Sequence, residues 1–366
     1  MKIECVKDRF TEAVIKAERV IGKNLSLPVL SCILIEAQGS TAVIRSTNLD
    51  LGIEITVPVK VKEQGSVAVP GQVFSSFLSA LQSDHSMVCE QEGSVFTITT
   101  EKNTTTINTM ATDDFPTIPL VGKQNRFLVP VKELLDGFHS VLFSSSIASV
   151  KPEYASILLY SDAEGIVFVA TDSFRLAEKK IRLKKKVEIQ HLLIPTKNAT
   201  EITRIFSDMV GDVAIDVEGN QISFSLDSVY VTSRLVDGSF PDYKQIIPKE
   251  FTTEAVVLKQ DFMNAMKVAN IFSDTFMQVG LQVIPKNKIF ELKTKNNTVG
   301  EQKTTIPAVF SGDEVAMNFN HRYLIDCFSS LNADSASFLF TGQGRPLVVR
   351  GATNKNFTYL IMPMNR

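Results

Sequence analysis

The order of hydrophobic and polar positions predicts short strands interrupted by short amphipathic helices. In six separated stretches an apolar run of strand length leads directly into apolar residues spaced three or four positions apart. Segments such as SVFTITT and NQISFSLDSVYVTSRL instead alternate apolar and polar residues, as half-buried antiparallel strands do. The six strand-and-helix stretches span residues 2–22, 69–82, 126–143, 194–209, 254–272 and 319–332.

These stretches recur in the same order in each third of the chain. The thirds also end alike, with DDFPTIP at 113–119, SFPDYKQIIP at 239–248 and LIMPM near the C-terminus, and polar VGKQNR and KEFTTE are typical of linkers. We therefore predict an α+β fold of three similar domains, each with two helices and two small antiparallel sheets. The predicted domains are residues 1–122, 126–248 and 249–366.

The stretch VFVATDSFRLAEKKI, residues 167–181, predicts a hairpin beside an apolar chain end. Its turn falls at Asp172 and Ser173, and period-two alternation places Arg175 on the opposite face from its apolar neighbours. Taken alone, this is an ordinary strand, turn and strand. The C-terminal TYLIMPMNR is unusually apolar for a terminus, however, so it forms either a buried last strand or a wall of a hydrophobic groove.

Composition narrows the class of protein. The chain is 44% hydrophobic and 21% charged, as soluble globular proteins are, and 38 Lys and Arg against 40 Asp and Glu leave a net charge of −2. Binding to polyanions by bulk charge is thereby excluded, so any nucleic-acid contact requires local segregation of charge. The scattered cysteines, without a CxxC pair, fit a reduced protein without a structural metal. No signal core or bilayer-length apolar run is present, which predicts a cytoplasmic protein.

Several separated motifs carry a family resemblance along the whole chain. ATDSFRLA at 170–177 resembles the ATDGHRLA-type motif of the bacterial DNA sliding clamp, the beta subunit of DNA polymerase III, and the MPM ending resembles the C-terminus of that family. LSLPVLSCILIEA, VAVPGQVFSSFLSAL, ATDDFP and SFPDYKQIIP follow the same family in order. The resemblance implies a head-to-tail homodimer whose six similar domains close a ring around duplex DNA. A closed ring is physically reasonable, because subunits joined by heterologous contacts form open filaments unless the ring closes.

Cations form a stripe on the first predicted helix. Phe10, Ala13, Val14 and Ala17 define its apolar face, and cations at spacings of seven, ten and fourteen lie opposite, with Glu12 the nearby carboxylate. Such a stripe is usually a solvated face, but the resemblance implies that it meets DNA phosphates without reading bases. Asn24 and Gln72 stand where family members are expected to carry basic residues. The DNA-facing positions are Arg9, Lys16, Arg19, Lys23, Asn24, Gln72, Lys151, Lys197, Arg204, Lys259, Lys267 and Arg322.

By resemblance, the hairpin and the C-terminus line a groove for short linear peptides of polymerases and the clamp loader. Methionines and aliphatic residues give such a groove an adaptable apolar surface, with Arg175 as a polar contact. Alternatively, all these residues belong to the core. Phe174 replaces a frequent histidine and Gln245 a common basic residue, and Tyr154 can face the groove or the DNA. The groove residues are Tyr154, Thr171, Ser173, Phe174, Arg175, Leu176, Pro241, Gln245, Ile246, Leu360, Met362, Pro363 and Met364.

The subunit contact is marked less clearly. Ile107, Ile271 and Phe272 match positions that meet across the interface in this family, although buried core is an equally good interpretation of them. Edge strands from the first and third domains would add backbone pairing at the same junction.

The sequence contains no recognisable set of catalytic residues, and no cofactor or metal is expected. The chain contains no phosphate-binding glycine loop, and GQGRP, beginning at Gly342, is more typical of a hairpin turn. Asp113 and Asp114 lack a third metal ligand, and Ser173 lacks a nucleophile-elbow glycine and an activating histidine. The basic run KKIRLKKK at 179–186 is interpreted as a solvated strand end because its cations alternate with apolar residues.

Two hypotheses for the function of the protein, from different functional classes, remain. The first is a non-catalytic processivity clamp that holds duplex DNA topologically and tethers polymerases and the clamp loader through the groove. The second is a protein-interaction scaffold that has the clamp fold but weakened or lost DNA function, as Asn24 and Gln72 suggest. An enzyme is disfavoured because the residues for it are missing.

Overall fold

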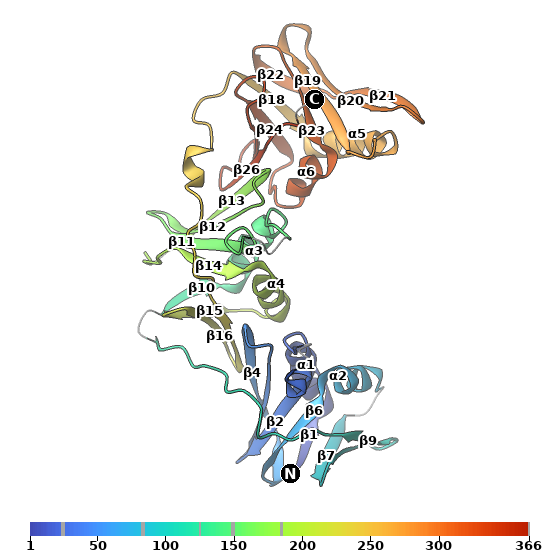
Figure 1. The fold of residues 1–366 in the computed structure, drawn as a ribbon, viewed down its shortest axis with the longest axis vertical. Coiled ribbons are helices and arrows are strands. Elements are labelled where there is room, and N and C mark those ends of the chain that lie inside the picture. The colour runs from blue at the N-terminus through green and yellow to red at the C-terminus, as the bar shows by residue number, and fades with distance from the viewer. Residues whose placement is uncertain (23–25, 82–84, 124–125, 148–150, 184–185, 365–366) are drawn as a thin grey trace. The chain divides into compact units, whose positions relative to one another are not determined.

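The structure is a computed structural model that describes residues 1–22, 26–81, 85–123, 126–147, 151–183 and 186–364. Contacts divide the chain into two compact units, one of residues 1–132 with 200–235 and one of residues 133–199 with 236–366 (Figure 1). Each unit is described separately.

Two antiparallel sheets and two helices form most of the first unit. One sheet has the order β5-β1-β7-β8-β9 and the other the order β10-β15-β16-β17-β4-β3-β2-β6. The helices are α1 (Lys7–Glu18) and α2 (Gly71–Ala80), and the 3-10 turn η1 is Pro28–Ser31. The strands are β1 (Lys2–Val6), β2 (Cys32–Gln38), β3 (Thr41–Thr47), β4 (Leu51–Pro58), β5 (Lys60–Glu63), β6 (Gly65–Pro70), β7 (Ser86–Glu92), β8 (Val95–Thr99), β9 (Thr104–Asn108), β10 (Phe127–Pro130), β15 (Asp212–Glu218), β16 (Gln221–Leu226) and β17 (Val229–Arg234).

The larger sheet of the first unit crosses the predicted boundary between the first and central domains. Strand β17 pairs antiparallel with β4, with Val231 opposite Ile53. The linker is also fixed, because the Tyr230 hydroxyl donates to the Pro119 carbonyl at 3.0 Å and accepts from the Val121 amide at 2.9 Å. Strand pairing therefore joins sheets of neighbouring sequence repeats, which is why the compact units do not coincide with thirds of the chain.

The second unit also contains two sheets. Their orders are β14-β11-β12-β13-β26-β25-β24-β18-β22 and β21-β20-β19-β23. The helices are α3 (Val131–Leu142) and α4 (Thr196–Ile205), whose residues are divided between the two units, α5 (Lys259–Ile271) and α6 (His321–Asp326), with 3-10 turns η3 (Tyr243–Gln245), η4 (Pro285–Asn287) and η5 (Cys327–Ser329). The strands are β11 (Ser156–Ser161), β12 (Gly165–Thr171), β13 (Arg175–Arg182), β14 (Leu192–Pro195), β18 (Thr253–Leu258), β19 (Gln278–Ile284), β20 (Ile289–Asn296), β21 (Gly300–Thr305), β22 (Ala308–Gly312), β23 (Val315–Asn320), β24 (Ser335–Phe340), β25 (Leu347–Gly351) and β26 (Phe357–Ile361).

The six predicted strand-and-helix stretches are confirmed, and each helix starts directly where its strand ends. Proline ends three of these strands, at Pro70, Pro130 and Pro195, where its fixed φ suits the entry to a helix. Asn320 serves the same purpose at α6, since its side-chain oxygen accepts from the amides of Arg322 and Tyr323.

Aromatic residues fill the core between each sheet and its helices. In the first unit the ring of Phe74 on α2 lies 6.3 Å from Phe10 on α1 and 5.6 Å from Phe96 on β8. In the second unit the ring of Phe262 on α5 lies 4.9 Å from Phe328 and 4.7 Å from Phe338. Such packing sets the distance between helix and sheet and so fixes where the exposed helix faces lie.

The predicted hairpin at 167–181 is confirmed as β12 and β13, and the C-terminal stretch is a buried last strand, β26, beside β13. Every residue of β12 is buried, because both of its faces are covered. Phe168 packs its ring 5.1 Å from Phe138 of α3, whereas Val167 and Val169 point into a core cluster on the other face. That second face carries the candidate groove.

Two turn predictions and one basic run can also be checked. GQGRP forms the turn between β24 and β25, and Asp113 and Asp114 are exposed in a turn. The solvated-strand interpretation of 179–186 does not hold for Lys179, which is buried and ion-paired with Asp136 at 2.6 Å. Two positions of that run, 184 and 185, lie outside the described residues.

Candidate functional site

The turn between β12 and β13 presents an aromatic side chain to solvent. Asp172 Oδ1 accepts from the amides of Phe174 and Arg175, each at 3.0 Å, and the Thr171 hydroxyl donates to the Arg175 carbonyl at 2.7 Å. Ser173 has a left-handed φ of 78°, which local hydrogen bonding to the turn supports. Phe174 is left 62% exposed, an unusual position for so large an apolar ring.

The C-terminal segment lies beside this turn. Leu176 pairs with Leu360 across β13 and β26, and the Met362 amide donates to the Phe174 carbonyl at 2.8 Å. Two residues later the Met364 amide donates to the Asn318 carbonyl of β23, also at 2.8 Å. Backbone pairing thus holds the last apolar residues between the central hairpin and the last third of the chain.

The predicted groove residues divide into a floor and a rim. Leu176 and Leu360 are each only 2% exposed and belong to a core cluster with Val167, Val169 and Tyr243. For these two residues the interpretation as core is therefore correct, and the partly buried Met362 packs against the same cluster. The rim consists of the partly or fully exposed Phe174, Pro241, Gln245, Ile246, Met362, Pro363 and Met364.

A buried hydrogen-bond chain anchors the rim segment at 241–246. The Tyr243 hydroxyl lies 2.7 Å from the Tyr160 hydroxyl and donates to Glu178 at 2.6 Å. Burial raises the pKa of Tyr243, and the adjacent Glu178 carboxylate raises it further, so this phenol stays a neutral donor. Because Tyr243 is fixed in the core, the neighbouring Ile246 is held at the surface. Gln245 bonds to Asp242 at 2.7 Å instead of reaching across the rim.

Arg175 ties the hairpin to helix α6. Its Nε lies 2.9 Å from Asp172, its Nη1 lies 2.5 Å from Asp326, and its guanidinium stacks 4.5 Å from the ring centre of Tyr323. The two carboxylates already form ion pairs with Arg175. Its side chain therefore serves to hold the hairpin and helix α6 in place, and is not a free contact for a ligand. Sequence reasoning missed Asp326 and Tyr323, because a partner on a distant helix leaves no local signal.

Tyr154 is half-buried, and the Lys151 ammonium lies 5.3 Å from the centre of its ring. This cation–π contact engages the aromatic face of Tyr154. It also places an exposed predicted DNA-facing cation, Lys151, next to a predicted groove residue.

The predicted DNA-facing residues do not form one uniform surface. Lys259 is half-buried and donates to the Leu331 carbonyl at 3.0 Å, and Arg204 pairs with Glu201 at 2.7 Å. Lys23 and Asn24 lie outside the described residues. Exposed positions in this set are Arg9, Arg19, Gln72, Lys151, Lys197, Arg204, Lys267 and Arg322.

Lys16 departs most from the predicted stripe. Its side chain is 8% exposed, and its ammonium lies 2.9 Å from Glu12 and 3.0 Å from Asp208. Asp208 is a second carboxylate that helical spacing could not reveal, since it follows α4, far along the chain. A cleft of about 370 Å³ beside this trio is also lined by Arg19 and Arg204. The cations of the cleft that remain open to solvent are therefore its two arginines.

The predicted interface residues have unequal exposure. Ile107 on β9 is buried, Phe272 is half-buried, and Ile271 at the end of α5 is 67% exposed. Two further exposed apolar residues, Phe276 and Val299, were not predicted. Asn296 bonds to the Ser273 carbonyl at 2.9 Å, which brings the turn carrying Val299 next to the segment carrying Ile271 and Phe276.

The described part of the chain offers no metal-binding group of three or more His, Cys, Asp or Glu residues. All four cysteines are buried and unbridged. Among the helices within the described ranges, none has the length and apolar character needed to cross a membrane.

Solved structures match this fold over its full length. The DNA polymerase sliding clamp of Bacillus subtilis has a TM-score of 0.94 at 24% identity and covers 100% of this chain and 99% of its own. The DNA polymerase III beta subunit of Thermotoga maritima has a TM-score of 0.95 at 21% identity, with 100% and 99% coverage. The architecture is thus the three-domain clamp fold of mixed helices and antiparallel sheets.

Sequence models of three consecutive domains identify the family. The N-terminal, central and C-terminal domains of the DNA polymerase III beta subunit match residues 1–119, 129–242 and 244–365. The chain therefore belongs to the DNA polymerase III beta subunit family, as the resemblance predicted. The beta sliding clamp of Staphylococcus epidermidis is 24% identical over 373 residues, and that of Synechococcus elongatus is 25% identical over 371, each covering 100% of this chain and 99% of the relative.

Proposed function

We propose that this protein is a non-catalytic DNA sliding clamp. In this proposal, a homodimeric ring encircles duplex DNA, slides without reading sequence, and tethers polymerases and the clamp loader through the rim and floor described above. The observation that carries the proposal is that the turn at 171–176, the segment at 241–246 and the C-terminal strand meet in one core cluster, through Leu176, Tyr243 and Leu360, with Met362 packed against it. Both the family membership and the full-length fold match support it. We further propose that the protein acts in the cytoplasm.

We propose domain boundaries at 1–122, 126–248 and 249–366. The spans matched by the three family domains, 1–119, 129–242 and 244–365, support them to within six residues. Because β17 pairs with β4 and β13 pairs with β26, these domains share sheets instead of being separated by open linkers.

The apolar residues of the rim together with the floor, which we name the peptide groove, are proposed to receive short linear peptides. The relevant surface comprises Phe174, Ile246, Met362, Pro363 and Met364 above the floor of Leu176 and Leu360. Methionine adapts to different ligands because its side chain is unbranched and polarisable. A solved relative from Pseudomonas aeruginosa, 22% identical with a TM-score of 0.94, is bound to griselimycin, which makes this compound a useful competitor in binding assays on the present chain.

Ring closure is proposed to pair the first domain of one protomer with the third domain of the other. Strands β9 and β21 each end a sheet and so leave an edge of backbone donors and acceptors unpaired within their sheets. The exposed Ile271, Phe276 and Val299 would be buried at the same junction. Ile107 contributes through the backbone of β9, since its side chain is already in the core.

Phosphate contacts are expected to come from the exposed cations and not from Lys16. Replacing Arg9 and Arg19 together by glutamine should lower the slope of log K against log salt concentration for duplex DNA, by about 0.9 for each phosphate that is no longer neutralised. Lys16→Gln should leave this slope unchanged, because the Lys16 ammonium is already ion-paired with Glu12 and Asp208. Fluorescence anisotropy over a salt series measures both, with Lys286→Gln, on η4, as the matched control. An equal slope change for Lys16→Gln would contradict this assignment.

The decisive experiment loads the protein onto nicked circular DNA with the clamp loader of its own organism and ATP, and then linearises the circle. Release on cutting is expected, because a closed ring is held by topology and not by tight affinity. Retention after cutting would indicate an ordinary DNA binder. Failure to load although the clamp loader binds the peptide groove would favour the alternative function, an interaction scaffold with lost DNA function, which the neutralised Lys16 and the uncharged Gln72 also suggest.

A further inference from the structure

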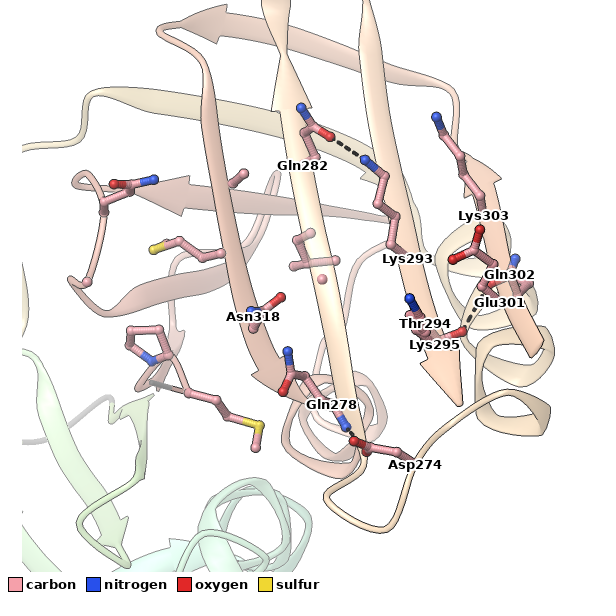
Figure 2. A pocket seen from close by; sticks show the side chains of 18 of the residues that line it. Asp274, Gln278, Gln282, Lys293, Thr294, Lys295, Glu301, Gln302, Lys303 and Asn318 are labelled. Carbon is pink, nitrogen blue, oxygen red and sulfur yellow. Dashed lines mark hydrogen bonds between the residues drawn. The ribbon is translucent and has the colours of Figure 1, made fainter. Parts of the chain in front are cut away.

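A polar hollow lies on one face of the sheet β21-β20-β19-β23. The buried Val279, Leu281 and Val283 of β19 face the core with helices α5 and α6, so the alternate residues of the same strand face away from it. The hollow encloses about 1090 Å³ on that outer face, and Figure 2 shows its polar side chains along neighbouring strands. We name it the outer groove and define it by Gln278, Gln282, Lys293, Lys295, Lys303 and Asn318.

The centre of the outer groove is formed by a glycine. Gly280 stands between Lys293 on β20 and Asn318 on β23 in the strand register, and it carries no side chain. A Cβ at this position would lie 3.1 Å from the Asn318 side-chain oxygen, closer than ordinary van der Waals contact. A glycine within a strand allows another backbone to approach closely. In this structure the Asn318 side chain lies close over Gly280, and both residues line the hollow.

Three lysines and two carboxylates, Asp274 and Glu301, line the outer groove, and positive charge is in excess at one place, away from Glu301, which is opposite Lys295. Lys293 and Lys303 are directly opposite across β20 and β21, and both contact the single carboxylate of Glu291, at 2.8 and 2.6 Å. The side chain of Glu291 is 5% exposed, whereas both lysines are exposed. One buried anion thus holds two cations together, which otherwise repel each other when opposed on a sheet. The solvent side of this trio is cationic.

The outer groove is continuous with the peptide groove. Pro363 and Met364 line the hollow as well as the peptide groove, and the Met364 amide is bonded to the Asn318 carbonyl of β23. This contact also occupies part of the β23 edge. Pairing of a second copy along β21 would use the other edge and leave the face of the sheet open.

We propose that the outer groove binds the polar, acidic flank of the same linear peptide whose apolar part occupies the peptide groove. This inference rests on the proposed function. The apolar residues of the peptide stop at Met364, and the next residues cross β23 and β19 toward Lys303 and Lys295. Amide side chains of Gln278 and Asn318 bond to the peptide along this path, and its carboxylates contact the lysines.

The test uses a short synthetic peptide from the replicative polymerase that binds the peptide groove and is displaced by griselimycin. Extensions of about four residues, roughly 13 Å when extended, are added at either end as Glu-Gly, Gln-Gly or Lys-Gly repeats. Titrations with the full dimer are expected to show about fivefold tighter binding for the acidic extension than for the glutamine extension at one of the two ends, and weaker binding for the lysine extension. Higher salt should reduce the difference.

Two double variants decide where the extension binds. Lys295→Gln with Lys303→Gln removes cations of the outer groove but leaves Lys293 to pair with Glu291, so folding is preserved. This variant should abolish the advantage of the acidic extension and leave the affinity of the short peptide unchanged. The matched control, Lys286→Gln with Lys355→Gln, removes two exposed cations elsewhere in the same third of the chain and should retain the advantage.

The outcomes separate this inference from the function on which it rests. If the short peptide binds but no extension changes its affinity, or if the advantage survives in the Lys295 and Lys303 variant, the outer groove is not the site and only this inference fails. If the short peptide does not bind the unaltered protein, the proposed peptide function fails, and the inference fails with it.

Discussion

Arg175→Ala is expected to weaken peptide binding at the peptide groove by tenfold or more. The side chain of Arg175 is 12% exposed and holds Asp172, Asp326 and Tyr323 together. Removing one partner of a largely buried ion pair costs about 3–5 kcal/mol, since the remaining carboxylates lose their counter-charge. Helix α6 and the hairpin turn would then no longer be held in one arrangement, and the peptide would have to order them on binding.

Titration with the griselimycin-displaceable peptide measures this effect. Arg182→Ala is the matched control, because its contact with Glu164 at 3.2 Å joins two exposed side chains and is worth little. A double-mutant cycle with Asp326→Asn should show strong coupling between Arg175 and Asp326 if the two act through each other. Unchanged affinity of Arg175→Ala, with the protein still folded, would show that Arg175 has no positioning role.

Ile271→Asp is expected to convert the dimer to monomers at concentrations where the unaltered protein is dimeric. Full burial of an exposed isoleucine contributes about 1.5–3 kcal/mol, and placing a carboxylate in the same apolar junction adds a desolvation cost. The dissociation constant should therefore rise at least about a hundredfold. Sedimentation equilibrium over a concentration series gives the mass directly.

The control for the dimer test is Val309→Asp on β22. Val309 is 72% exposed, also lies in the last third of the chain, and belongs to a strand at the edge of the other sheet of the second unit. It should not change the mass in solution. A dimer that survives Ile271→Asp, or an unaltered protein that is monomeric at all concentrations, would overturn the proposed junction.

The local sequence pattern was sufficient to predict the helices and strands, but not to predict which strands pair with each other. The apolar run before Asp172 and the strand-to-helix transitions at Pro70, Pro130 and Pro195 are properties of neighbouring residues, so the sequence predicted them. Pairing of β17 with β4 depends on which strand edges meet after folding, and period-two alternation contains no information on that choice. The extension of sheets across sequence repeats could not be predicted for this reason.

The same distinction applies to the charged residues. Helical spacing placed Lys16 correctly relative to Glu12, but its burial results from Asp208, which follows another helix. Arg175 was recognised as a groove residue by family resemblance, whereas its partner Asp326 lies on α6 and became visible only in three dimensions. Spacing indicates which side of an element a cation occupies, and only tertiary contacts decide whether that cation is free.

Sheet continuity also limits how this protein can be divided. A fragment ending near residue 122 would keep β4 but lose β17, leaving the backbone groups along Ile53 and Ile55 without their partners. An exposed, apolar strand edge promotes aggregation because it can pair with the edge of another chain. The three sequence repeats are therefore poor modules for separate expression or domain grafting, and a cut designed between them would need to carry the partner strand with it.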